Sequence, residues 1–262
     1  MSKCIFFDID GTLWDDYMEI PESTKTAIRK LKENGHKTFL CSGRARANIQ
    51  DERLLSLGFD GIVAACGNHV EMDGKVLYSR LVPQERVREI VEILDACHMP
   101  VVLEGPEKHW ISRVGFEEDP FVAYLFEVMQ ERAIPLDGYT EDIEMNKFSA
   151  DVLPTTDYET IKKEISRDFD ILEHTGNVLE FVPKGTSKAT GIQWVCEYLH
   201  VDHADTYAVG DSINDLDMLE YVAHGIAMGN ATPPAMAAAE YVTADIHEDG
   251  IYLAMQHYGL IS

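Results

Sequence analysis

The sequence has 262 residues, enough for one large domain or two smaller ones with a sizeable buried core. Hydrophobic residues make up 45% and charged residues 26%, which excludes a wholly disordered, collagenous or coiled-coil chain. The 22 Lys and Arg against 46 Asp and Glu give a formal net charge of −24. We therefore expect no nucleic-acid partner and no membrane partner, because those surfaces are themselves negatively charged.

The five cysteines are scattered and form no CxxC pair. This pattern indicates free, buried thiols in a reducing compartment rather than a disulfide framework or a zinc site. The first apolar run meets Asp8 too early for a signal peptide, and no apolar run approaches the ~20 residues of a membrane-spanning helix. We expect a cytoplasmic protein whose oligomeric state the sequence leaves open, with a monomer compatible.

The first 65 residues alternate between strand and helix patterns. Short apolar runs at 4–7, 38–41 and 61–65 are typical of strands buried on both faces. One helix is expected between Pro21 and Gly35, and a second over residues 45–57. This βαβαβ order predicts a doubly wound parallel sheet.

The pattern changes from residue 70. Residues 70–78 alternate around Asp73-Gly74, a strong hairpin signal, and an amphipathic helix is expected over 83–96. Between about 99 and 183 the elements no longer alternate tightly, which indicates an α+β unit of its own. Its expected strands are 101–103, 148–153, 169–172 and 178–182, and its expected helices are 120–131 and 157–166.

The alternation returns after residue 184. Helices are expected at 187–199, 216–221, 234–239 and 251–258, and strands at 206–209, 226–228 and 241–243. The sequence therefore predicts an α/β fold: a doubly wound, Rossmann-like core formed by residues 1–82 and 184–262, with an inserted α+β domain at residues 83–183.

Four segments at expected strand or helix ends carry reactive residue types. Ligands of open α/β sheets bind beyond the carboxyl ends of the strands. The segments are Asp8-Ile9-Asp10-Gly11-Thr12, Ser42-Gly43-Arg44, Lys188 in Gly185-Thr186-Ser187-Lys188, and Gly210-Asp211-Ser212-Ile213-Asn214-Asp215. The adjacent carboxylates of the first segment need a nearby cation or a proton. The hydroxyl of the second segment, at an expected helix start, suits an anion. Acids beside Asn, as in the last segment, often ligate hard cations. Taken singly, the segments are also compatible with a solvated turn, an ordinary N-cap, a surface lysine and an Asx-rich turn.

Together the four segments resemble, in order, the motifs of the haloacid dehalogenase (HAD) superfamily. The resemblance covers essentially the whole chain and is closest to the Cof-like sugar-phosphatase branch, in which a large α/β cap lies where residues 83–183 lie here. It implies that Asp8 is the nucleophile that forms an aspartyl-phosphate and that Asp10 is the general acid/base. It also implies Mg²⁺ as the cofactor, held by Asp8, the Asp10 backbone carbonyl and Asp211.

The remaining roles implied by the resemblance concern the phosphate and its counter-charges. Lys188 would bridge Asp8 and the phosphate, and Asp215 would orient Lys188 or contribute to the metal site, directly or through water. Phosphate oxygens would be bound by Ser42, Gly43, Arg44 and Asn214. The cap would set specificity, with Arg44, Arg46, His109, Trp110, Arg113 and Lys147 as candidates. Trp110 could equally stack on a sugar or belong to the cap core.

The expected function is Mg²⁺-dependent hydrolysis of small phosphate esters, with sugar phosphates the leading class. Two alternatives stay open. A phosphotransferase or phosphomutase acting on hexose phosphates would share the aspartyl-phosphate, and a catalytically silent regulator would only bind phosphate.

Overall fold

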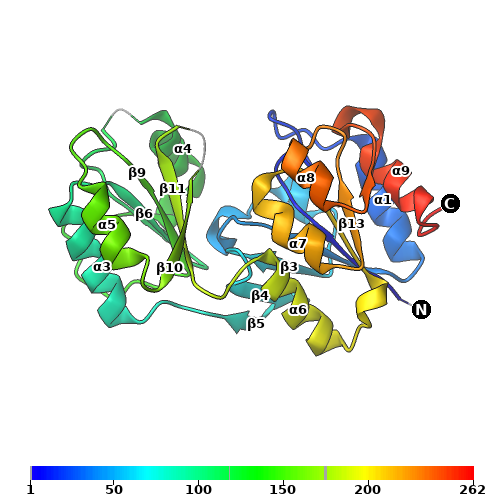
Figure 1. Ribbon diagram of the computed structural model, residues 1–262, viewed down its shortest axis with the longest axis horizontal. Coiled ribbons are helices and arrows are strands. Elements are labelled where there is room, and N and C mark those ends of the chain that lie inside the picture. Colours follow the sequence, from blue (N-terminus) through cyan, green and yellow to red (C-terminus); the bar gives the residue numbers. More distant parts are fainter. Residues whose placement is uncertain (1, 118, 174–175) are drawn as a thin grey trace. The chain divides into compact units, whose positions relative to one another are not determined.

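The computed structural model describes residues 2–117, 119–173 and 176–262 (Figure 1). The chain forms two units, each with its own core. The first unit consists of Met1–Gly43, Gln50–Tyr78 and Ser187–Ser262, and the second of Arg44–Ile49 and Ser79–Thr186. Across the described ranges, no helix is long and apolar enough to cross a membrane.

The first unit is built on an eight-stranded sheet in the order β14-β13-β12-β1-β2-β3-β4-β5. The first six strands in this order run parallel, and β4 is antiparallel to β3. The strands are β1 (Cys4–Phe7), β2 (Lys37–Cys41), β3 (Gly61–Ala64), β4 (His69–Met72), β5 (Lys75–Ser79), β12 (Thr206–Gly210), β13 (His224–Ala227) and β14 (Tyr241–Val242). All four residues of β1 are buried, as expected for a central strand covered on both faces.

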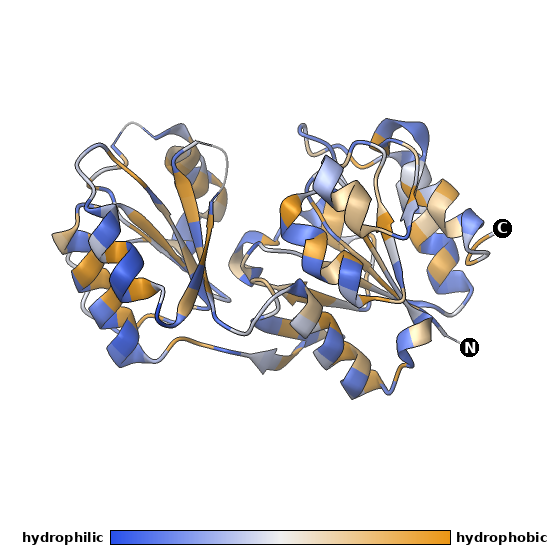
Figure 2. Cartoon of the chain, in the orientation of Figure 1, coloured by the Kyte–Doolittle hydropathy of each residue, from blue (hydrophilic) through white to orange (hydrophobic). Residues whose placement is uncertain are grey.

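Helices cover both faces of this sheet. On one side α1 (Glu22–Glu33) packs against α9 (Gly250–His257), and on the other α7 (Leu216–Tyr221) packs against α6 (Lys188–Leu199) and α8 (Pro233–Ala238) (Figure 1). Hydrophobic residues follow the strands and the inward faces of the helices (Figure 2). The predicted α/β, doubly wound fold class is confirmed.

The prediction of a single helix over residues 45–57 is wrong. The structure has a 3₁₀ turn, η1 (Arg46–Asn48), and a short helix, α2 (Glu52–Leu55). The helix is interrupted because the side chains of Arg46 and Asp51 form hydrogen bonds with backbone groups that a continuous helix would use. The Arg46 guanidinium donates to the Ile49 carbonyl oxygen at 2.7 Å, and the Asp51 carboxylate accepts from the Arg53 backbone N–H at 2.9 Å, which starts a new helix.

The second unit has a six-stranded sheet in the order β10-β11-β9-β6-β7-β8. Its strands are β6 (Val101–Glu104), β7 (His109–Ile111), β8 (Ala133–Pro135), β9 (Lys147–Asp151), β10 (Phe169–Glu173) and β11 (Val178–Pro183). The sheet is antiparallel except for the parallel pair β7–β8. Sequence analysis missed β7 and β8, because three-residue strands are too short to show a period of two.

Alternate residues of this sheet face two separate cores. Leu103 and Trp110 face the core under α3 (Gln84–Ala96) and α5 (Tyr158–Ile165). Val102 and Ile111 face the core under α4 (Pro120–Met129). Trp110 packs edge-on against Tyr139, with ring centroids 6.1 Å apart. Of the two alternatives for Trp110, the structure supports the core position.

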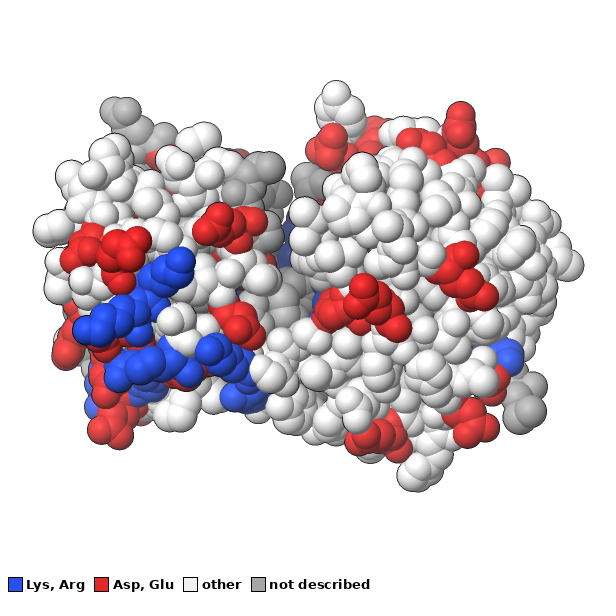
Figure 3. Space-filling model, in the orientation of Figure 1, with Lys and Arg blue, Asp and Glu red and all other residues white. Residues whose placement is uncertain are grey.

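The second unit also holds a buried ion-pair cluster. Lys147 Nζ donates to Glu104 Oε1 at 2.9 Å and to Glu180 Oε1 at 2.6 Å, and these side chains lie on neighbouring strands. Elsewhere on this unit, Lys and Arg gather over α3 and α5 (Figure 3). Part of that charge is neutralised, since Arg86 pairs with Asp168 at 2.7 Å.

Candidate active site

Asp8 lies at the topological switch point of the first sheet. Its strand, β1, is flanked by β2 and by β12, and the chain builds the sheet outward from β1 on one side and from β12 on the other. The Asp8 backbone N–H donates to the Val209 carbonyl at 2.9 Å, which continues the β1–β12 ladder. Such a crevice is where open α/β sheets bind their ligands.

Lys188 joins the first acidic segment to the last. It is the first residue of α6, and its Nζ donates to Asp8 Oδ1 at 2.6 Å and to Asp215 Oδ1 at 2.5 Å. The side chains of Lys188, Asp8 and Asp215 are only 1%, 4% and 0% exposed. A fully buried lysine at the start of a helix is held there by these two carboxylates, so the surface-lysine alternative is excluded.

Asp215 organises the loop that follows β12. Its Oδ2 accepts from the backbone N–H of Asp211 at 2.9 Å and from that of Ser212 at 3.0 Å. Asp211 in turn accepts a hydrogen bond from the Thr12 hydroxyl at 2.6 Å. These contacts connect two segments that are about two hundred positions apart in the sequence.

Gly11 allows the two acidic segments to approach closely. Its φ of +80° is strained for residues with a side chain, and an added Cβ would lie 2.4 Å from Asp211 Oδ2. Asp10, just before it, is exposed and accepts a hydrogen bond from the indole N–H of Trp14 at 2.9 Å. The tight turn therefore directs Asp8 into the cluster and Asp10 toward solvent.

The residues expected to bind phosphate fall into three places. Ser42 follows β2, beside β1, and is 2% exposed, and Gly43 comes next in the same unit. Asn214 is half-buried in the loop after β12, where its Oδ1 accepts from the Ser212 hydroxyl at 2.5 Å. Arg44 belongs to the second unit.

Burial and crowding shift the pKa values in the cluster. Burial, reinforced by the charge of Asp215, raises the pKa of Asp8 well above its usual range, although Lys188 opposes the shift. Burial raises the pKa of Asp211 to about 6, against the hydrogen bond from Thr12. Burial by itself would lower the pKa of Lys188, but the carboxylates of Asp215 and Asp8 raise it well above its usual range, so this lysine is charged.

The acids fit a hard cation. Carboxylate oxygens of Asp8, Asp211 and Asp215 lie within 4.8 Å of one another. Oxygen donors in such a cluster are what Mg²⁺ and Ca²⁺ prefer. Burial first, and then the charge of the neighbouring acids, raise the pKa values of Asp8 and Asp211, and a bound cation would offset both effects.

Three contacting residues were not assigned roles by sequence analysis. They are Thr12, which donates to Asp211, Trp14, which donates to Asp10, and Asp217, which accepts from the backbone N–H of Ala189 at 3.1 Å. Thr12 belongs to the first motif and could have been assigned from it. Nothing in the spacing of Trp14 or Asp217 indicates its partner.

Similarity to known proteins agrees with this geometry. A model of the haloacid dehalogenase-like hydrolase family matches residues 5–255. The "Putative phosphatase YkrA" of Bacillus subtilis (strain 168) is 33% identical over 261 residues, covering 99% of each chain. A hypothetical protein from Geobacillus kaustophilus HTA426 superposes over all of both chains with a TM-score of 0.85 and 29% identity. The HAD subclass IIB sugar phosphatase BT4131 superposes with a TM-score of 0.81 and 27% identity, over 99% of this chain and 100% of that one.

The first unit thus combines a doubly wound sheet with a buried carboxylate–lysine cluster at its switch point. The chain belongs to the haloacid dehalogenase-like hydrolase family. The predicted family and the predicted enzyme class, a phosphatase, are thereby confirmed.

Proposed function

We propose that the protein is a Mg²⁺-dependent phosphomonoesterase that hydrolyses small phosphorylated metabolites, sugar phosphates in particular, through an aspartyl-phosphate on Asp8. The observation that carries this proposal is the buried Asp8–Lys188–Asp215 cluster beside Asp211, at the carboxyl edge of the parallel strands. Similarity to a solved sugar phosphatase supports the substrate class.

Asp8 acts as the nucleophile. Its carboxylate attacks phosphorus, a P–O bond to Asp8 forms, and the bond between phosphorus and the ester oxygen breaks. An anionic nucleophile approaching an anionic phosphate meets repulsion, which the Lys188 ammonium 2.6 Å from Asp8 reduces. Asp215 holds Lys188 in place from the other side.

Asp10 acts as the general acid and then the general base. It donates a proton to the departing ester oxygen and later takes one from the water that hydrolyses the aspartyl-phosphate. The Trp14 indole N–H donates to Asp10 Oδ1 at 2.9 Å, and this hydrogen bond orients the exposed carboxylate that transfers the proton.

Asp8, Asp211 and the backbone carbonyl of Asp10 would hold Mg²⁺, which when bound neutralises phosphate charge in the transition state. We assign Asp215 mainly to positioning, because both of its carboxylate oxygens already accept hydrogen bonds from Lys188 and from the 210–215 loop. In this proposal the phosphate oxygens are bound by Ser42, Gly43, Arg44 and Asn214.

The inserted domain serves as the cap that selects the leaving group. In this proposal the enzyme works in the cytoplasm on free metabolites, and its net charge of −24 makes the local positive charge of Lys188 and the cation essential for binding an anion.

The test is a phosphate-release screen over many metabolite phosphates with Mg²⁺. Phosphate release should stop with EDTA and return with Mg²⁺. Asp8→Asn should lose at least ~10³-fold in kcat, because it removes the nucleophile. Asp170→Asn, an exposed acid on β10, is the matched control and should retain activity.

Three outcomes would contradict parts of the proposal. Full activity after chelation would exclude the metal, and near-normal turnover by Asp8→Asn would mean that another residue attacks. Isomerisation of a hexose phosphate without phosphate release would identify the phosphomutase alternative. Phosphate binding without any turnover across the screen would favour the silent regulator.

A further inference from the structure

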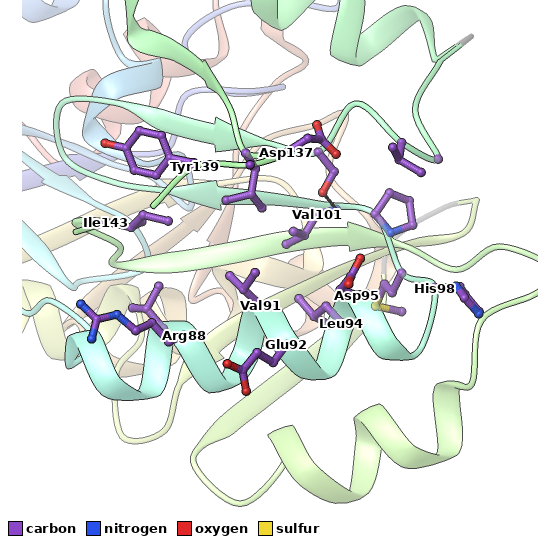
Figure 4. A pocket seen from close by; sticks show the side chains of 18 of the residues that line it. Arg88, Val91, Glu92, Leu94, Asp95, His98, Val101, Asp137, Tyr139 and Ile143 are labelled. Atoms are coloured by element: carbon purple, nitrogen blue, oxygen red, sulfur yellow. Dashed lines mark hydrogen bonds between the residues drawn. The ribbon is translucent and has the colours of Figure 1, made fainter. Parts of the chain in front are cut away.

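The second unit contains a groove of about 790 Å³ that the phosphatase chemistry does not use (Figure 4). It lies between α3 and the segment 136–143, which follows β8. Its volume is within the range of about 300–1,000 Å³ typical of small-molecule sites. All of its lining residues belong to the second unit.

The groove is formed because an irregular segment packs beside α3. Leu136 and Ile143 anchor the two ends of that segment in the same core as Val87 and Leu94 of α3. At one end Gln84 joins the two walls, since its side chain donates to the Ile143 carbonyl at 2.6 Å and accepts from the Ile143 N–H at 2.9 Å. This pair of hydrogen bonds connects the two walls at that end.

The interior of the groove is apolar. Val91 and Leu94 point from α3 toward Val101 of β6, and Ile143 and the Tyr139 ring lie along the far side (Figure 4). Val91 and Tyr139 are only half-buried, so an apolar ligand would cover them. Burying that surface stabilises a complex by about 25 cal/mol for each Å².

The edges of the groove are acidic on both sides. Glu92 and Asp95 lie on α3, and Asp137 and Glu141 lie on the opposite segment. The basic side chains among the described lining residues are Arg88, which pairs with Asp142 at 2.8 Å, and His98. The described lining residues therefore place several unbalanced negative charges around an apolar centre.

We propose that this groove binds a small organic cation with an apolar body, such as an aryl- or alkylammonium compound. The apolar part would lie on Val91, Val101 and Tyr139, and the ammonium group would lie between Asp95 and Asp137. The Tyr139 ring offers a flat face on which an aryl body can stack.

Other occupants fit less well. A phosphate ester would meet the carboxylates of Asp95, Asp137, Glu92 and Glu141, so the groove is not a second substrate site. An extended peptide would need a continuous channel, and the Gln84–Ile143 hydrogen bonds connect the two walls at one end. A metal ion would leave the apolar centre unused.

The experiment measures binding of phenethylammonium by calorimetry at physiological salt and locates it by backbone-amide NMR shifts. The neutral probe of similar shape is 2-phenylethanol, and tetramethylammonium is a cation without the aryl body. We expect phenethylammonium to bind with shifts at Val91 and Tyr139. Each of the other two probes should bind at least about tenfold more weakly, which corresponds to about 1.4 kcal/mol.

The variant Asp95→Asn/Asp137→Asn should weaken phenethylammonium binding at least about tenfold. The Asp137 carboxylate accepts from the Arg113 backbone N–H at 2.7 Å, and the amide that replaces it keeps an oxygen acceptor, so the local fold is retained. The matched control Glu85→Gln/Glu131→Gln removes the same charge from exposed positions outside the groove and should bind as the unchanged protein does.

Several results would overturn the proposal. They are absence of phenethylammonium binding at millimolar concentration, shifts that map elsewhere, equal binding of the neutral probe, or equal weakening by the control variant. The last result would show that the net charge of −24, rather than the groove, attracts the cation. Because the probe comparison uses the unchanged protein, it decides the proposal even if a variant were unstable.

Discussion

Replacing Lys188 by Met tests the buried cluster directly. The substitution keeps an unbranched side chain of similar size but removes the ammonium that contacts Asp8 at 2.6 Å and Asp215 at 2.5 Å. Both carboxylates stay almost fully buried and lose their positive partner. Breaking a buried ion pair in this way costs about 3–5 kcal/mol. At about 2–4 °C for each kcal/mol in a chain of this size, the melting temperature without metal should fall by roughly 6–20 °C at pH 8.

The loss should depend on pH in a defined direction. Burial and Asp215 already raise the pKa of Asp8 above its usual range, and removing Lys188 raises that pKa further. A carboxyl group with a raised folded-state pKa stabilises the fold fully below its unfolded pKa and loses that contribution as pH rises through the folded value. The difference in melting temperature between the two proteins should therefore be smaller at pH 5 than at pH 8.

Lys147→Met provides a matched control. Lys147 is also buried between two carboxylates, those of Glu104 and Glu180 at 2.9 and 2.6 Å. Replacing it by Met should therefore reduce the stability of the fold by a comparable amount. Mg²⁺ should restore part of the stability lost by Lys188→Met and none of that lost by Lys147→Met. A melting temperature for Lys188→Met within 2 °C of the unchanged protein, on the order of less than 1 kcal/mol, would refute the reasoning. A loss that is independent of pH would do the same.

Three further predictions concern neighbouring residues. Because burial raises the pKa of Asp211 to about 6, protons compete with Mg²⁺ for its carboxylate. The increase in melting temperature on adding Mg²⁺ should therefore grow between pH 5 and pH 7.5. An increase that is the same at both pH values would exclude Asp211 as a ligand. Trp14→Phe removes the hydrogen bond to Asp10. It should lower kcat more for alkyl phosphates than for p-nitrophenyl phosphate, because the p-nitrophenolate leaving group needs little protonation. Equal losses of kcat with the two substrates would show that Trp14 only supports the fold. Asp217→Asn weakens the contact at the start of α6 that positions Lys188 and should lower kcat several-fold with little change in KM, whereas a change confined to KM would contradict this role.

Much of the candidate site was predictable because it is carried by short, continuous segments. Asp8 and Asp10 follow a buried strand, and Asp211 and Asp215 follow another, so the rule that ligands bind at the carboxyl ends of parallel strands brings them together. The α/β alternation and the interruption by an α+β unit could also be predicted, because hydrophobic periodicity is a local property of the chain.

The sequence could not assign roles that depend on contacts between distant segments or on local competition for the backbone. Trp14 and Asp217 carry no motif, and their roles follow from the Asp10 and Ala189 groups that folding places beside them. The helix expected over 45–57 fails because the Arg46 and Asp51 side chains bind backbone groups that a helix would need, which periodicity does not record.

The family, the α/β architecture and the acids and lysine of the candidate site could be predicted from the sequence, because those features lie in contiguous motifs. The tertiary structure decided that Lys188 is fully buried between Asp8 and Asp215, that Trp110 belongs to a core, and that four acids surround an apolar groove. Burial and the distances between charges arise only when remote segments pack together, and these quantities set the pKa values of Asp8, Lys188 and Asp211.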